Sequence, residues 1–104
     1  MVERVWSAHA ATRESGEGYA AYFQRVVLPE LRAVPGYRGA RLLQRELRGT
    51  IEIVVSTRWE SLEAIRGFAG DDIHRAVVHP EATAFFSDYE HSVKHYEVVS
   101  EDPS

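Results

Sequence analysis

A chain of 104 residues with a formal net charge of −4 is long enough for one domain, and its acidic balance argues against a broad nucleic-acid surface. The absence of cysteine excludes disulfides, thiolate catalysis and cysteine-ligated metal sites. No apolar run approaches the ~20 residues of a membrane span and the first ten residues do not resemble a signal peptide, so we expect a cytoplasmic domain over residues 1–100 with a polar tail over 101–104.

The first part of the chain has the pattern of a strand followed by a long helix. Residues 2–10 alternate apolar with polar or small side chains, which is typical of a strand. Apolar residues then recur at helical spacing over 19–34, and Ser15 is a suitable N-cap. Because this stripe continues in phase across Pro29, we predict one helix that bends at the proline. A proline–glycine pair at 35–36 ends it.

A hairpin comes next. Two extended runs, 37–47 and 51–59, are separated by three residues that include Gly49, which accepts the positive φ of a tight turn. The second run alternates, and one of its faces carries Ile51, Ile53, Val55, Thr57 and Trp59.

Short helical pieces separate the hairpin from the last strand. Ser61 is expected to cap a helix over 61–69, and Gly70 to end it. A second piece is predicted over 72–79 and a third over 80–88, before strand-like alternation returns over 89–100.

The order β-α-β-β-α-β predicts an α+β domain of the ferredoxin-like type. Helices cover only one face of such a sheet. A monomer would expose the apolar residues of the other face to water, so we expect a homodimer in which two sheets pack together. By alternation these residues are Val54, Val5 or Trp6, and either Val93 or the pair Tyr96 and Val98.

Three stretches of the chain are of recognisable type: LRAVPGYRGARLLQRE, GTIEIVVSTRWES running into LEAIRGFAG, and HYEVV. Together, over residues 2–99, they resemble the antibiotic-biosynthesis-monooxygenase family, most specifically at the triplets 35–37 and 59–61. The resemblance implies a dimeric α+β barrel with a cavity between the sheet and the helices of each subunit. The family includes cofactor-free oxygenases of polyketide-type aromatics, heme-degrading enzymes and members with no known activity.

The heme-degrading branch of that family uses an asparagine on the first strand, a tryptophan after the hairpin and a histidine ten residues later. Aligned on Trp59, the tryptophan position falls at Phe68, the histidine position at Val78 and the asparagine position near His9. These departures argue against heme degradation by that route. His79, one residue from the histidine position, keeps heme as the alternative to having no cofactor.

Five histidines are many for this length. His74 and His79 lie on the segment expected to cover the cavity mouth, where a neutral imidazole can take a proton from a phenol or an activated C–H. We therefore predict His74 and His79 as catalytic residues. His91 and His95 share a strand face and could join His9 in a metal cluster, but a structural role is favoured and no metal is predicted.

Large aromatic side chains on the helix-facing elements either fill the core or line a pocket for a flat aromatic ligand. We predict that the substrate is held by Tyr22, Phe23, Trp59, Phe68 and His9.

Three functions remain open at this point. The first is a cofactor-independent oxygenase, in which a base deprotonates the substrate and the electron-rich carbanion reacts directly with O₂. The second is heme binding or heme degradation, and the third is a non-catalytic ligand-binding or stress-response module. Isomerase or lyase chemistry is a weaker fourth, because it also begins with proton abstraction. In each of them the partner is a small apolar or aromatic molecule rather than nucleic acid or a membrane.

Overall fold

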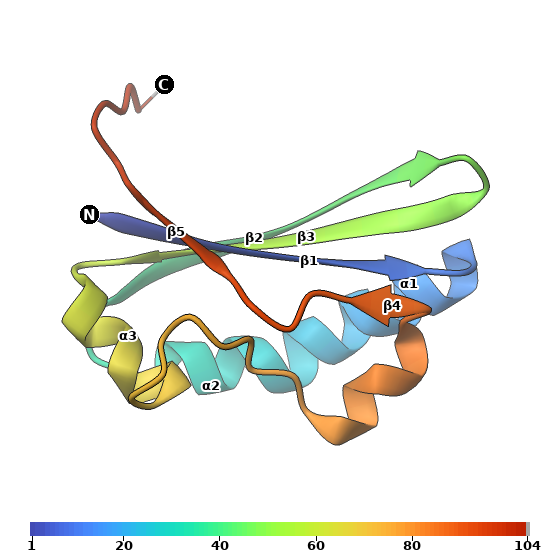
Figure 1. Ribbon diagram of the computed structural model, residues 1–104, viewed down its shortest axis with the longest axis horizontal. Helices are drawn as coiled ribbons and strands as arrows, with labels where there is room; N and C mark the ends of the chain where they lie inside the picture. The colour runs from blue at the N-terminus through green and yellow to red at the C-terminus, as the bar shows by residue number, and fades with distance from the viewer. Residues whose placement is uncertain (104) are drawn as a thin grey trace.

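Five antiparallel strands form one layer of the protein, and the helices form a second layer on one side of it (Figure 1). The computed structural model describes residues 1–103, so the last residue of the predicted tail lies outside the described residues. The first three strands agree with the predicted strands to within one residue. The strands are β1 (Val2–Ala10), β2 (Tyr37–Leu47), β3 (Thr50–Trp59), β4 (Asp88–Tyr89) and β5 (Lys94–Glu97).

The sheet has the order β2-β3-β1, with β4 and β5 both paired to the remaining edge of β1. The first strand therefore lies between the third and the last, and the predicted ferredoxin-like fold is confirmed. The single strand predicted over 89–100 is interrupted between β4 and β5. There the backbone bonds to the preceding loop instead: the Val93 N–H donates to the His74 carbonyl, and the Ala76 N–H donates to the His91 carbonyl, both at 2.9 Å.

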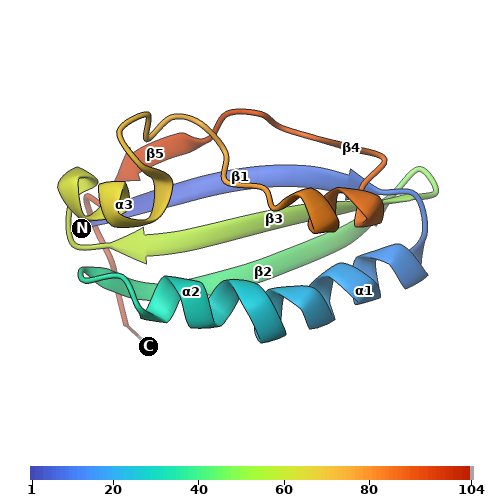
Figure 2. The same cartoon turned by 90° about the horizontal axis from the view of Figure 1, so that it is seen from below.

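The long helix is a continuous rod made of α1 (Arg13–Tyr22), a π-helical turn (Phe23–Val27) and α2 (Leu28–Arg32), along the β2 side of the sheet (Figure 2). It begins earlier than predicted, because the Thr12 side chain, rather than that of Ser15, is the N-cap. The π turn ends at Val27, two residues before Pro29. Since proline has no N–H and its ring crowds the carbonyl four residues earlier, a wider turn lets the helix continue. No helix in residues 1–103 has the length and apolar character to cross a membrane.

Two short helices lie between β3 and β4. The first, α3 (Leu62–Ala69), has the predicted N-cap Ser61 and ends at Gly70, whose φ is 81°. The second is a 3₁₀-helix (Pro80–Phe85), shorter than the piece predicted over 80–88.

The prediction of a helix over 72–79 is wrong, because these residues form an irregular loop. The Arg4 guanidinium donates to the carbonyls of Ile73 (2.5 Å) and Arg75 (2.8 Å). In a helix those carbonyls would accept from N–H groups four residues later. The backbone groups of the loop therefore make their hydrogen bonds with a distant side chain and with the segment between β4 and β5. The local sequence pattern contains no information about such distant partners.

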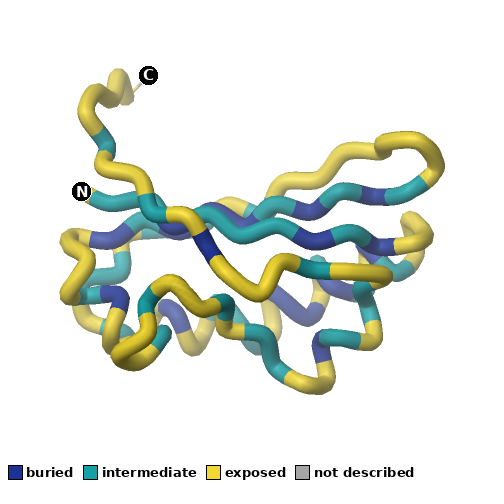
Figure 3. The backbone as a smooth tube through the Cα atoms, in the orientation of Figure 1, coloured by how far each residue is buried: buried dark blue, intermediate teal, exposed yellow. Residues whose placement is uncertain are grey.

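The helix-facing side of the sheet forms the core. Figure 3 shows buried positions along the strands and exposed ones in the C-terminal tail and at the hairpin tip. The predicted inner face of β3 is confirmed, because all five of its residues are buried: Ile51, Ile53, Val55, Thr57 and Trp59.

The opposite face of the sheet carries no helix among the described residues (Figure 1). The strand register assigns Val5 and Tyr96 to this open face, whereas Trp6 and Val93 lie on the helix-facing side. Leu43 on β2 is 46% exposed and Tyr96 is 52% exposed, so the open face offers apolar side chains to water.

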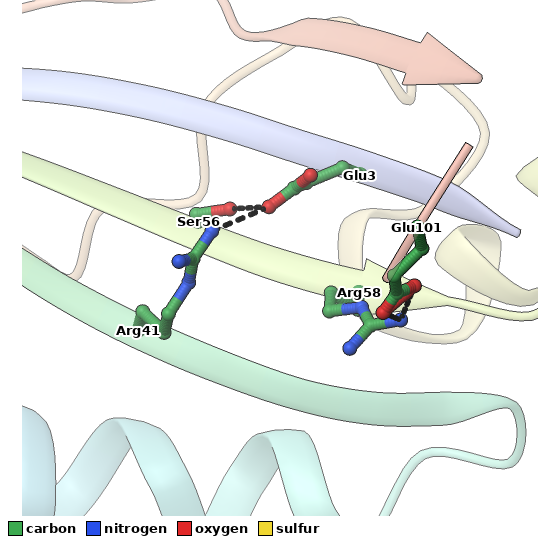
Figure 4. A network of polar contacts seen from close by, with 5 residues as sticks. All are labelled: Glu3, Arg41, Ser56, Arg58 and Glu101. Atoms are coloured by element: carbon green, nitrogen blue, oxygen red, sulfur yellow. Dashed lines mark hydrogen bonds and ion pairs between the residues drawn. The ribbon is translucent and has the colours of Figure 1, made fainter. Parts of the chain in front are cut away.

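Charged residues on the same face form ion pairs, two of which are drawn in Figure 4. The carboxylate of Glu3 accepts hydrogen bonds from Ser56 Oγ (2.5 Å) and Arg41 (3.2 Å), and these contacts hold the pKa of Glu3 below its usual range. Arg58 pairs with Glu101 of the C-terminal segment at 2.5 Å. The open face is thus a mixed surface, apolar in part and crossed by ion pairs.

Candidate active site

A cavity of about 50 Å³, open to solvent at its mouth, lies between the sheet and the helical layer. One wall is the inner face of β1 and β3, and the other comes from the long helix, α3 and the segment that contains the 3₁₀-helix. Most of the lining is apolar or aromatic, and Arg4 and His79 bring ionisable groups to two places in it. Its walls include Trp6, Tyr19, Val55, Phe68, Phe86 and Val93.

The aromatic walls are fixed by contacts among themselves. The ring centroids of Tyr19 and Phe86 are 4.8 Å apart, and those of Trp6 and Phe86 are 5.4 Å apart with the planes at 74°. The Trp6 indole N–H also donates to the Glu90 carbonyl at 2.7 Å, which orients the ring. An enclosure of this kind suits a flat aromatic ligand, because ring faces and edges favour offset and edge-on contacts.

A histidine–carboxylate pair lies at the cavity mouth. His79 lines the cavity, and its Nε2 is 2.9 Å from Oε2 of Glu30 on the long helix. Because the carboxylate accepts, Nε2 carries the proton in the neutral ring, and Nδ1 is left as the basic nitrogen. This arrangement orients an imidazole for proton transfer.

Tyr22 lies beside this pair. Its ring centroid is 6.3 Å from that of His79, and its hydroxyl donates to Glu81 Oε1 at 3.0 Å. Burial of the ring, followed by the hydrogen bond to Glu81, raises the pKa of Tyr22 to about 12. A backbone hydrogen bond and the bond from Tyr22 lower the pKa of Glu81. The pair is therefore a neutral phenol bonded to a carboxylate at neutral pH.

A buried cation lies in another part of the cavity wall. Arg4 is only 4% exposed, and its guanidinium carbon is 6.0 Å from the centroid of the Phe68 ring. Burial lowers the pKa of Arg4 to about 10, so the side chain still carries its charge at neutral pH. The apolar cavity thus contains one full positive charge.

His95 is the neighbour of this cation. Its Nε2 is 3.0 Å from Arg4 Nη1, and since arginine only donates, Nε2 accepts and the ring proton lies on Nδ1. Burial, the Arg4 charge and His74 lower the pKa of His95, which favours this neutral form. The buried Nδ1 has no hydrogen-bond partner in the described part of the chain.

The cavity contains some of the residues that the sequence predicts for the site. Tyr22, Phe68 and His79 line it. Trp59 and Phe23 lie outside its lining and fill the core instead: Trp59 is fully buried against Tyr37 and Phe68. Their large aromatic surfaces are used in packing.

Two predicted histidines lie away from the cavity. His9 belongs to the open face of β1, opposite the cavity, and its Nδ1 is 2.7 Å from the Asp88 carboxylate. His74 is exposed on the loop after α3, with its ring centroid 5.4 Å from that of His95. His9, His91 and His95 do not converge, and residues 1–103 contain no group of three potential ligands arranged for a metal ion.

Sequence reasoning misses Arg4 and Glu30. A signal exists for Arg4, since it alternates in phase with Val2, Trp6 and Ala8 and so puts a cation on the apolar face of its strand. No such signal exists for Glu30, which lies off the apolar stripe of its helix like any solvated residue. Its partner His79 is 49 residues away in sequence.

The comparisons with known proteins agree with this architecture. A family model described as "Antibiotic biosynthesis monooxygenase" matches residues 6–80. No match is found among curated proteins.

Among solved structures, the heme-degrader MhuD of Mycobacterium tuberculosis, with two hemes bound in its active site, aligns with 23% identity and a TM-score of 0.66 over 99% of this chain and 100% of its own. A monooxygenase from the gene ActVA-Orf6 of Streptomyces coelicolor, in complex with Nanaomycin D, aligns with 17% identity and a TM-score of 0.62 over 99% and 92%. A dimeric ferredoxin-like protein from an uncultured marine organism aligns with 11% identity and a TM-score of 0.65 over 97% of each chain. At these identities the likeness establishes the fold.

Proposed function

The chain belongs to the antibiotic biosynthesis monooxygenase family, and on that premise we propose that it is a small-molecule oxygenase that oxidises a planar, polyketide-like aromatic substrate with O₂ and without a cofactor. The observation that carries the proposal is the His79–Glu30 pair at the mouth of an aromatic cavity. The ActVA-Orf6 monooxygenase, similar in fold, is known in complex with the ligand Nanaomycin D, which supports a small-molecule ligand here as well.

The proposed mechanism begins with proton abstraction by His79. Its Nδ1 accepts a proton from an activated C–H or phenol of the bound ring, while Glu30 stabilises the imidazolium that results. Tyr22, which stays neutral because its pKa is about 12, holds the Glu81 carboxylate next to the base. The walls formed by Trp6, Tyr19 and Phe86 exclude water from the carbanion.

The electron-rich carbanion then reacts with O₂. For an anthrone-type methylene, a carbon–oxygen bond forms, the proton held by the histidine returns to the peroxide, and loss of water leaves a ketone. The balance is CH₂ + O₂ → C=O + H₂O, so O₂ supplies both oxygen atoms of the products. The oxidant is O₂ itself.

Oxygen uptake with anthrone in metal-chelated buffer tests this proposal. We expect one O₂ consumed per anthrone, and a rate about 10²–10⁴-fold lower in His79→Ala, which is the usual contribution of a general base. His91→Ala, an exposed histidine outside the cavity lining, is the matched control and should retain the wild-type rate.

The single variant His74→Ala tests the other predicted catalytic histidine. Unchanged uptake in the double variant His74→Ala/His79→Ala would remove both histidines from the mechanism. A wild-type protein that binds anthraquinone yet consumes no O₂ with anthrone would instead be the non-catalytic ligand-binding module.

Heme binding is a second candidate, favoured by the same pair. A histidine that ligates a metal usually donates its other ring N–H to a carboxylate, and His79 does so to Glu30. MhuD, similar in fold, has hemes in its active site. His79 would hold the iron through Nδ1, and a bound heme would supply oxygen-activating chemistry. A hemin titration is expected to shift the Soret band in wild type and His91→Ala but not in His79→Ala, and an unshifted wild type would end this alternative.

We also propose that two copies pair through the open face of the sheet. Exposed Leu43 and Tyr96 would be covered there, and one protein of similar fold is a dimeric ferredoxin-like protein. Light scattering is expected to give about twice the 11.8 kDa of one chain. A Leu43→Arg variant should weaken the pairing. A wild-type particle of one chain's mass would contradict it.

A further inference from the structure

Arg4 is a buried cation without a counter-charge. Its guanidinium donates to the carbonyls of Ile73 and Arg75 and to His95 Nε2, and no carboxylate of residues 1–103 lies within ion-pair distance of it. Three of its five N–H groups are used in these contacts, which leaves two without a partner in the same residues. Buried charges in proteins are ordinarily paired, because removal from water is costly.

A structural role explains part of this arrangement. By binding two loop carbonyls, Arg4 fastens the irregular segment after α3 to β1. Neutral donors such as glutamine or asparagine can bind carbonyls as well, and they do not bring a full charge into an apolar wall. The charge and the two spare donors therefore remain unexplained by the loop alone.

The position of the group supplies a second argument. Arg4 lines the same cavity as Trp6 and Phe86, and its guanidinium lies over Phe68. His95 accepts a hydrogen bond from the guanidinium as a neutral ring and so adds no competing negative charge. A flat ligand in the cavity would thus meet aromatic walls along its faces and a fixed cation at its edge.

We infer that Arg4 is the recognition site for an anionic oxygen on the ligand, a carboxylate or an ionised enol attached to a flat ring system. His95 is a positioning residue that holds the guanidinium. The inference rests on the proposed function in one respect, namely that the cavity takes a flat aromatic molecule. It narrows the substrate class from planar aromatics to planar aromatic acids.

Calorimetric titration with matched ligand pairs tests the inference without any turnover. The first pair is 2-naphthoate and 2-naphthamide, which differ in charge and hardly in shape. The second is 2-hydroxy-1,4-naphthoquinone, ionised at neutral pH, and its methyl ether. We expect wild type to bind the anion of at least one pair about tenfold or more tightly than the neutral partner. The pair that shows the preference identifies the anionic group.

Two variants assign the preference to its residue. Arg4→Gln is expected to reduce the anion preference to about onefold while the neutral ligands keep their affinity. Arg75→Gln is the matched control, since it removes the same charge from an exposed side chain of the loop that Arg4 binds, and it should keep the preference. His95→Gln should reduce the preference by less than Arg4→Gln does.

A direct measurement avoids dependence on the folding of Arg4→Gln. In wild-type protein labelled with ¹⁵N, the Nε–H resonance of Arg4 is expected to shift on addition of the anion and not of its neutral partner. Equal affinity for both members of both pairs, or a preference that survives Arg4→Gln, would overturn the inference and leave the oxygenase proposal standing. Absence of binding by all four ligands would overturn both.

Discussion

Gly36 offers the sharpest test of how the fold positions the cavity, because replacement by alanine is expected to fail for two separable reasons. Its φ is 91°, in a region that side-chain-bearing residues occupy at a cost of about 1–2 kcal/mol. A Cβ added there would lie 2.5 Å from the Cβ of Ala64 on α3. Overpacking of this kind costs about 1–3 kcal/mol. Gly36→Ala should therefore lower the free energy of unfolding by about 2–5 kcal/mol.

Urea unfolding followed by circular dichroism measures this loss, and two further variants divide it. Gly49→Ala has a comparable φ of 82° and no atom within 4 Å of its added Cβ, so it should show the backbone part alone. Gly36→Ala/Ala64→Gly removes the collision and keeps the backbone strain. A double-mutant cycle should then give a coupling energy of about 1–3 kcal/mol between the two positions. The helix-propensity cost of Ala64→Gly is present in both the single and the double variant, so it cancels in the cycle. A loss below about 1 kcal/mol in Gly36→Ala, or a coupling near zero, would refute the reasoning.

The remaining predictions concern titration and packing. Because the pKa of Tyr22 is raised to about 12, the pH–rate profile of oxygen uptake should have the same shape in Tyr22→Phe as in wild type below about pH 10. A change of rate on the basic side of the wild-type profile that disappears in Tyr22→Phe would contradict this prediction. Burial, followed by the charges of Arg4 and His74, lowers the pKa of His95. Below pH ~6.5 this histidine is therefore protonated to a greater extent in the unfolded chain than in the folded one. The free energy of unfolding should therefore decrease as the pH is lowered through that range. Urea midpoints measured at several pH values should show a smaller decrease in His95→Gln than in wild type. Ile65 is fully buried in α3, and Ile65→Ala should cost about 2–5 kcal/mol in the same urea assay, with a loss under 1 kcal/mol as the contrary result.

Local patterns determined the strands and the ends of α3. Period-two alternation is strong in β1 and β3, where one face of the strand is largely buried, and the predicted bounds of β1, β2 and β3 agree with the structure to within one residue. The cap Ser61 and the stop Gly70 act through contacts within four residues, so they too could be predicted.

The candidate site was predicted only in part, since a residue type reveals a chemical capacity and not a location. Of the predicted residues, His79, Tyr22 and Phe68 line the cavity, while Trp59 and Phe23 pack in the core. Which aromatic residues face a cavity depends on the angles between elements that lie far apart in the chain.

The sequence by itself determined a ferredoxin-like α+β domain with an apolar inner face, because hydrophobic periodicity is a local property that each element carries alone. Only the tertiary structure decided that residues 72–79 form a loop and that the inner-face cation Arg4 lines a cavity. The reason is physical: the guanidinium of Arg4 binds carbonyls 69 and 71 residues later in the chain. A backbone carbonyl whose hydrogen-bond donor lies that far away in the chain cannot be recognised from the residues next to it in sequence.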